Sequence, residues 1–127
     1  MSHMAKIKGQ IKNLEALKRA SSKLGLAFIE NATSARYYAN NTVKCSHKIT
    51  MPNTSYEIGV VKEKDDTYGL QTDFYDANVT KAIGRDGVKL RDSYNEEVTR
   101  MFAESTGKSV FRETEEDGTV VLRLRAF

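Results

Sequence analysis

Two of the most reactive side chains in the sequence, Cys45 and His47, lie two residues apart. In a β-strand this spacing points both side chains to the same face. His3 could join them from a neighbouring strand, and a thiolate with two imidazoles is a ligand set that suits zinc. No second pair of cysteines or histidines supports this site. The commoner arrangement is a buried cysteine beside a half-exposed histidine.

The same thiol and imidazole are also the groups that serve as nucleophile and general base in acyl transfer. No motif in the sequence supplies an oxyanion hole for that chemistry. The sequence also contains no Walker loop, no dinucleotide-binding fingerprint and no Ser-His-Asp signature. We therefore predict that the protein is not an enzyme and uses no cofactor.

The loop from Gly84 to Gly87 is a candidate for binding nucleic acid. It resembles the GXXG loop of a KH domain, which holds a nucleic-acid backbone between two short helices, and Arg85 and Lys89 would be its cations. The helix predicted after the loop is about two turns too long for a KH module. The segment Asp73–Asn78, just before the loop, does not show the apolar strand and helix that a KH module has there. The alternative is that the two glycines end one helix and begin the next.

Basic residues form a second candidate surface for phosphates. Lys12, Arg19 and Lys23 fall on one face of the first predicted helix, and Lys6 and Lys8 lie on the strand before it. Such a patch could bind a nucleic-acid backbone. The alternative is a solvated helix face together with charged strand edges that discourage aggregation.

Acidic residues cluster near the end of the chain, at Glu113, Glu115, Glu116 and Asp117. Paired carboxylates can act as acid and base, but water would screen these residues at the tip of a hairpin. We therefore do not assign them a catalytic role.

Length and composition indicate one ordinary globular domain, residues 1–127, of 14.3 kDa. Hydrophobic residues make up 39% and charged residues 29%, which is not a disordered composition. A net charge of +3 is too small to indicate a nucleic-acid partner. One cysteine and no apolar run of membrane-spanning length predict a soluble, cytoplasmic protein.

Alternating polar and apolar residues predict a central hairpin from Tyr56 to Tyr75, around an Asp-rich turn. A first amphipathic helix should start after Asn13 and stop at Gly25, and a second should cover 88–105. The apolar stripe of the second helix is expected to consist of Val88, Tyr94, Val98, Met101, Phe102 and Ser105. Further strands are expected at 3–11, 26–30 and 43–51, with a second hairpin at 110–127 around Asp117-Gly118. This order predicts an α+β fold of ferredoxin-like character, an antiparallel-rich sheet with two helices packed on one face.

Several short stretches of the sequence carry a resemblance to a known family. They are Met1-Ser2-His3, Leu14–Lys18, Cys45-Ser46-His47, Tyr56–Val61 and Glu116–Thr119. Together they resemble the Ycf-thirty-five family, open reading frames of algal chloroplasts and cyanobacteria with relatives in bacteriophages. The resemblance implies a small α+β domain of unknown function without established catalytic residues. Genes of this kind often lie near an AAA-type ATPase, which suggests such an ATPase as a partner by analogy only.

Three hypotheses about function follow from the sequence. The first is a non-enzymatic binding or adaptor protein that acts on a protein partner, including an inhibitor of a host system if the chain is phage-encoded. The second is a nucleic-acid-binding module that uses the basic first helix or the Gly84–Gly87 loop. The third, ranked last, is a metal-dependent enzyme at His3, Cys45 and His47.

Overall fold

The computed structural model describes residues 4–126, and within that range the side chains of 108–111 and 124–126 lie outside the description. The described chain contains three α-helices: α1 (Leu14–Lys23), α2 (Ala77–Ile83) and α3 (Val88–Ser105). Its strands are β1 (Met4–Ile11), β2 (Ala27–Ile29), β3 (Ser34–Arg36), β4 (Thr42–Lys44), β5 (His47–Thr50), β6 (Glu57–Lys62), β7 (Tyr68–Asp73), β8 (Lys108–Thr114) and β9 (Val120–Ala126). Three short 3-10 turns are η1 (Tyr38–Asn40), η2 (Lys64–Asp66) and η3 (Arg85–Gly87).

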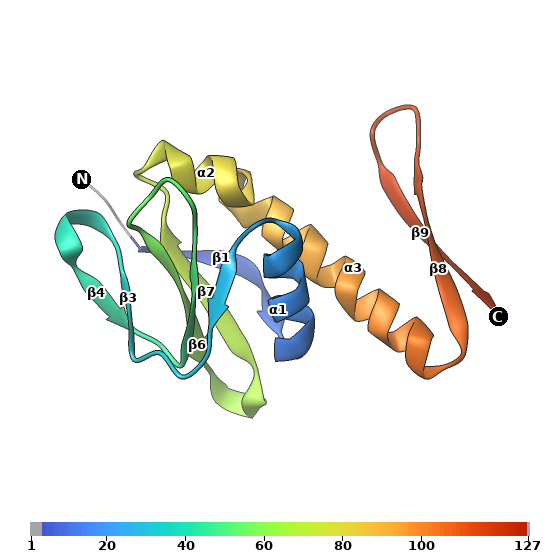
Figure 1. Ribbon diagram of the computed structural model, residues 1–127, viewed down its shortest axis with the longest axis horizontal. Helices are drawn as coiled ribbons and strands as arrows, with labels where there is room; N and C mark the ends of the chain where they lie inside the picture. The colour runs from blue at the N-terminus through green and yellow to red at the C-terminus, as the bar shows by residue number, and fades with distance from the viewer. Residues whose placement is uncertain (1–3, 127) are drawn as a thin grey trace.

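Five strands form one antiparallel sheet in the order β1-β7-β6-β5-β2. The hydrophobic core lies between the sheet and the helices, and it includes Leu17 of α1, Leu90 of α3 and Ile58 of β6, all fully buried. The predicted α+β class, with two helices packed on an antiparallel sheet, is therefore confirmed (Figure 1). The ferredoxin-like comparison stays a prediction. The first two strands, β1 and β2, occupy opposite edges of this sheet.

The predicted helix starts and stops are confirmed at α1. The side chain of Asn13 accepts a hydrogen bond from the backbone N–H of Ala16, so it caps the helix as expected. Gly25 follows the helix with a φ of +74°, the left-handed conformation that glycine adopts without strain. The start and end of α3 also match the predicted range.

The predicted strand at 43–51 is wrong as a single element. The structure divides it into β4, which pairs with β3, and β5, which belongs to the main sheet. The backbone N–H of Cys45 donates to Thr33, whereas that of Ser46 donates to Val60, so the chain passes between the two sheets at this point. The β3–β4 hairpin lies against β6 on the side opposite the helices, where Gly59 leaves room for Val43 and Cys45.

The predicted apolar stripe of α3 is only partly correct. Tyr94 is buried, and its hydroxyl accepts hydrogen bonds from the backbone N–H groups of Lys12 and Asn13 at 2.9 and 3.2 Å. Phe102, which we placed on the stripe, is 57% exposed. Glu97 is buried instead and forms an ion pair with Lys23 of α1. The two helices are therefore joined by a charged contact as well as an apolar one.

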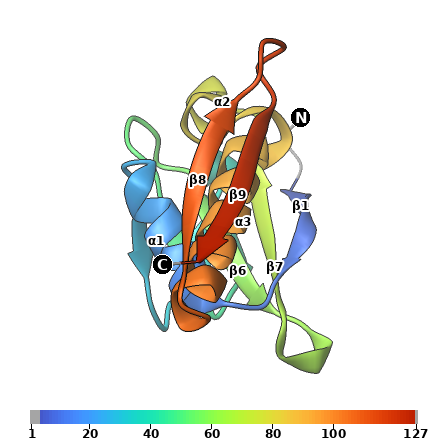
Figure 2. The same cartoon turned by 90° about the vertical axis from the view of Figure 1, so that its right-hand side faces the viewer.

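The last hairpin, β8–β9, forms a two-stranded sheet of its own around the predicted Asp117-Gly118 turn. Figure 1 shows it leaving the C-terminal end of α3 and standing apart from the main sheet, and Figure 2 shows the same hairpin from the side. Outside itself, its main contacts are between β8 and α3. No described helix is long and apolar enough to cross a membrane.

Glu57 is a buried carboxylate on the face of the sheet away from the helices, with 4% of its surface exposed. Oε1 accepts a hydrogen bond from the backbone N–H of Arg36 at 2.9 Å, and Oε2 lies 3.0 Å from the Lys48 ammonium. Burial works to raise the pKa of Glu57, but the Arg36 amide and the Lys48 ammonium together hold it below its ordinary value. Its contribution to stability is therefore present at neutral pH and lost as the pH falls.

We predict that Glu57→Gln lowers the free energy of unfolding at pH 7 by about 2–4 kcal/mol, because Lys48 loses its anionic partner. The parent should lose this advantage as the pH falls below about 4.3, where an unperturbed glutamate takes up a proton. Urea unfolding followed by circular dichroism from pH 7 to pH 3 measures both effects. Glu15→Gln, at an exposed position paired with Arg19, is the matched control and should change stability by about 0.5 kcal/mol or less. Equal unfolding curves for the two variants would contradict this role of Glu57.

Gly87 is the point at which the α2–α3 connection packs against the sheet. Its φ is +76°, and a Cβ at this position would lie 2.8 Å from Cδ1 of Ile7. We expect Gly87→Ala to lower the free energy of unfolding by about 2–4 kcal/mol, from the strained backbone and the overpacking against Ile7. Gly118→Ala also has a positive φ but no atom within 4 Å, so it should cost only about 1 kcal/mol. Thermal unfolding of the two variants separates the packing effect from the backbone effect.

Candidate functional site

A basic cleft of about 530 Å³ lies between the edge strand β1 and the connection from α2 to α3. Its lining includes Lys6 and Lys8 from β1, Arg85 from η3 and Arg91 from α3. Four cations face one carboxylate of the lining, that of Asp86. The ring of Phe74 also lines the cleft and supplies an apolar surface beside the charges.

Strand geometry explains why the lysines are exposed. Ile7 is buried against the core, so its neighbours Lys6 and Lys8 point to the other, exposed side of β1. The pairing of β1 with β7 is irregular between Ile7 and Ile11. Gly9 lies in this irregular stretch with a φ of +108°, and the stem of Arg91 packs close to its backbone, with Cδ 3.7 Å from where a Cβ would be.

The Gly84–Gly87 loop forms one wall of the cleft. Gly84 ends α2 with a φ of +82°, and Gly87 begins α3, so the glycines do cap two successive helices as one of our interpretations predicted. The objection that no strand and helix precede the loop is wrong. The strand β7 ends at Asp73, and Asp76 caps α2 by accepting a hydrogen bond from the backbone N–H of Asn78 at 2.9 Å. Two helices therefore flank the loop, and α3 has the length that was predicted for it.

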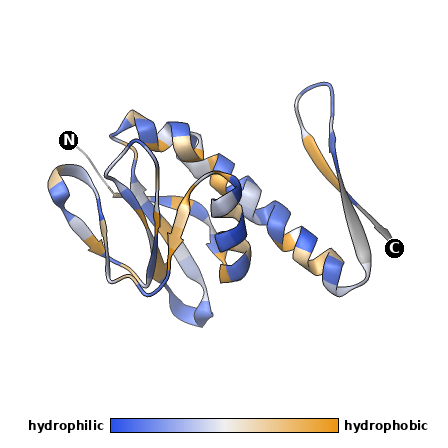
Figure 3. Cartoon of the chain, in the orientation of Figure 1, coloured by the Kyte–Doolittle hydropathy of each residue, from blue (hydrophilic) through white to orange (hydrophobic). Residues whose placement is uncertain are grey.

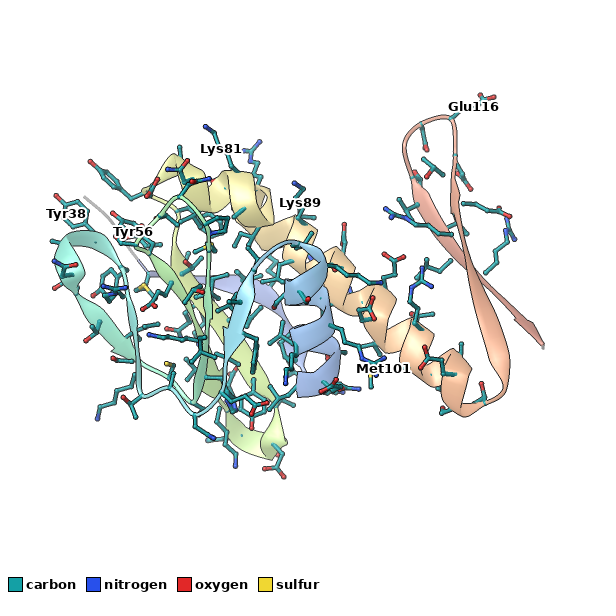
Figure 4. All side chains as sticks on the ribbon, in the orientation of Figure 1. Tyr38, Tyr56, Lys81, Lys89, Met101 and Glu116 are labelled. Atoms are coloured by element: carbon teal, nitrogen blue, oxygen red, sulfur yellow. The ribbon has the colours of Figure 1, made fainter. Side chains whose placement is uncertain are left out.

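The predicted nucleic-acid-binding residues do not lie on one surface. Arg85 lines the cleft, whereas Lys89 is exposed and is not part of its lining. Figure 4 shows Lys89 and Lys81 projecting from the helices on the same side. Lys12, Arg19 and Lys23 belong to the region of α1, a separate part of the molecule.

Acidic neighbours offset much of the positive charge on α1. Lys23 is paired with the buried Glu97. Arg19 lies 3.5 Å from Glu15 and 3.9 Å from Glu104. The uncompensated positive charge is therefore greater in the cleft than on α1. Sequence spacing could not show this, because the carboxylates that neutralise α1 come partly from α3.

The predicted zinc ligands are placed as follows. His3 lies outside the described residues. His47 pairs with Val60 on the helix side of the sheet, and its ring packs between Phe28 and Tyr68 with centroid distances of 5.5 and 5.6 Å. Its Nδ1 accepts a hydrogen bond from the backbone N–H of Asn31 at 3.1 Å. Cys45 lies on the opposite side of the sheet, against Gly59.

The environment of Cys45 also disfavours the thiolate that a nucleophile needs. Burial raises the pKa of the Cys45 thiol; Lys48 opposes this effect and Glu57 adds to it. A raised pKa keeps the sulfur protonated at neutral pH, and the protonated thiol is the less reactive form. Among the described side chains, no group of three His, Cys, Asp or Glu residues is placed to hold a metal ion.

Sequence reasoning missed Arg91 as a residue of this site, because its approach to β1 depends on how α3 crosses the sheet edge.

A comparison of the chain with protein-family models, with curated proteins and with solved structures returned no match.

Proposed function

We propose that this protein is a non-enzymatic adaptor that binds a protein partner through the β8–β9 hairpin and the exposed end of α3. The observation that carries the proposal is the isolation of the hairpin. Two-stranded sheets are marginal in water unless a third strand or a helix covers them, and this one contacts mainly α3. A partner that covers the hairpin would supply the missing burial.

Two exposed apolar side chains belong to the proposed contact surface. Val120, at the start of β9, is 44% exposed, and Phe102 of α3 is 57% exposed. Figure 3 shows an apolar segment on the hairpin next to its hydrophilic tip. Aromatic side chains such as Phe102 are enriched in the buried centres of protein interfaces.

The charge of the hairpin tip indicates the chemistry of the partner. Glu115, Glu116 and Asp117 are all exposed there, and Figure 4 places Glu116 at the outer end of the molecule. Glu113 is offset by Arg123, whose Nε donates a hydrogen bond to its carboxylate at 2.8 Å. The remaining negative charge favours a partner with a basic surface and should speed association at low salt.

We predict that Val120→Asp and Phe102→Asp each abolish capture of a partner that the parent chain retains. The matched control is Ile29→Asp, because Ile29 is 41% exposed on the edge strand β2 and receives the same charge. The measurement is affinity capture from lysate with the four baits, followed by mass spectrometry. The supporting result is a protein retained by the parent and by Ile29→Asp but lost from the other two. Retention of the same proteins by all four baits would overturn the proposal.

A second candidate function is binding of single-stranded nucleic acid at the basic cleft. The observation that favours it is that four cations line one cleft beside the Gly84–Gly87 loop, with Phe74 in the same lining. The side chain of Arg85 would contact a phosphate beside the loop. Lys6 and Lys8 would extend the contact along β1.

We expect a labelled single-stranded RNA to bind the parent with an affinity that falls steeply with salt. Four phosphate contacts give a slope of about −3 in a plot of log affinity against log salt concentration. The double variant Arg85→Glu/Arg91→Glu should weaken binding by about tenfold or more at low salt. The control is the double variant Lys18→Glu/Arg19→Glu on α1, which makes the same charge change outside the cleft. Fluorescence anisotropy of the labelled RNA measures the affinity of each double variant. Equal losses in both variants would indicate a net-charge effect and would contradict a cleft site.

Membership of the Ycf-thirty-five family, a cytoplasmic location and an AAA-type ATPase as the partner are further proposals. They are supported by the short sequence stretches quoted above and by analogy.

A further inference from the structure

The cations of the basic cleft differ from the other buried or half-buried charges of the chain in having no ion-pair partner. Lys23 and Lys48 are paired with buried glutamates. Among the side chains that the structure describes, no carboxylate lies within ion-pair distance of the four cleft cations, which are Lys6, Lys8, Arg85 and Arg91. Like charges that line one cleft concentrate a positive potential there and attract an anion.

The cleft also has an apolar wall. Phe74, Val88 and Ala5 belong to its lining, and Val88 is 36% exposed at the start of α3. Charged and apolar groups in one concave surface restrict what can fill it. The ligand that matches both parts carries several negative charges close to an apolar group.

The tip of the β8–β9 hairpin has this combination. Glu115, Glu116 and Asp117 are consecutive and exposed, and among the described side chains no cation pairs with them. Val120 follows three residues after Asp117 and is 44% exposed. The backbone N–H of Thr119 donates a hydrogen bond to Oδ1 of Asp117 at 2.9 Å, which holds the turn in shape. The tip is therefore a preformed acidic loop beside an apolar side chain.

The tip lies far from the cleft of its own chain. The cleft is at the N-terminal end of α3, and the hairpin leaves the C-terminal end. The 18 residues of α3 span about 27 Å between these two ends. Figure 1 shows the hairpin standing apart from the main sheet, and Figure 4 places Glu116 at the outer end of the molecule. A tip that fills a cleft must therefore come from another molecule.

We propose that the acidic hairpin tip of one chain binds in the basic cleft of a second copy of the same chain. Glu115 and Glu116 would pair with the guanidinium groups of the cleft, because a guanidinium can bind a carboxylate through two parallel hydrogen bonds. Val120 would lie against the apolar wall. Two copies that exchange tips make this contact twice, and the second contact strengthens the first and closes the assembly as a dimer.

This inference shares the hairpin with the adaptor proposal and the cleft with the nucleic-acid candidate, but it is tested apart from both. Self-association is measured on the purified, nuclease-treated full chain, where neither another protein nor RNA is present. Phe102→Asp, which tests the adaptor proposal, leaves every charge of the new contact in place. Each of the three proposals can therefore fail without the others.

The test is sedimentation velocity of the parent and of two double variants at low salt. Arg85→Glu/Arg91→Glu reverses the charge of the cleft, and Glu115→Lys/Glu116→Lys reverses that of the tip. The parent should show a concentration-dependent dimer that dissociates as salt is added. Each double variant alone brings like charges together, so its dimerisation should weaken by about tenfold or more. An equimolar mixture of the two restores opposite charges at both contacts, and dimers should reappear.

Two control variants make the same charge changes at exposed positions outside the contact. They are Lys18→Glu/Arg19→Glu and Glu15→Lys/Glu30→Lys, and both should dimerise like the parent. A parent that stays monomeric at low salt would overturn the proposal, as would a mixture of the two reversed variants that forms no dimers. Parental dimerisation of the folded tip variant would do the same, and this result decides the matter if the cleft variant does not fold.

Discussion

The arrangement of the whole molecule depends on burying one face of the β6–β7 hairpin. Ile58, Val60 and Leu70 point to the same side of the sheet and are almost completely buried beneath α1 and α3. Because a strand alternates its side chains, this burial also decides what lies on the other side. Glu57 and Gly59 must face away from the helices, and the β3–β4 hairpin covers them there.

Charge distribution shows how the fold turns a mildly basic sequence into distinct surfaces. On α1 the cations are offset by carboxylates from α1 itself and from α3, so a patch that looks basic in the sequence is partly neutralised. In the cleft, cations from β1, η3 and α3 meet a single acid. The tip of the C-terminal hairpin is negative, because Glu115, Glu116 and Asp117 are exposed there. A net charge of +3 therefore combines a positive region and a negative one.

Local features of the fold could be predicted from the sequence, because each depends on neighbouring residues. The Asn13 cap, the Gly25 stop and the Asp117-Gly118 turn are examples in which residue type and backbone geometry are directly linked. Features formed between distant segments could not be predicted. The partners of Glu57 come from residues 36 and 48, and nothing in the local pattern indicates that they meet. The same is true of the candidate site, where Arg85 was identified but Arg91 was not.

The placement of β1 at the sheet edge beside β7 has a consequence for how the chain assembles during synthesis. Met4 pairs with Asp73, so β1 has no sheet partner until β7 has also left the ribosome. The meander of β5, β6 and β7 needs only short loops and can form as it emerges. During that interval the lysines of β1 keep its unpaired edge soluble, which protects the nascent chain from edge-to-edge pairing with other chains.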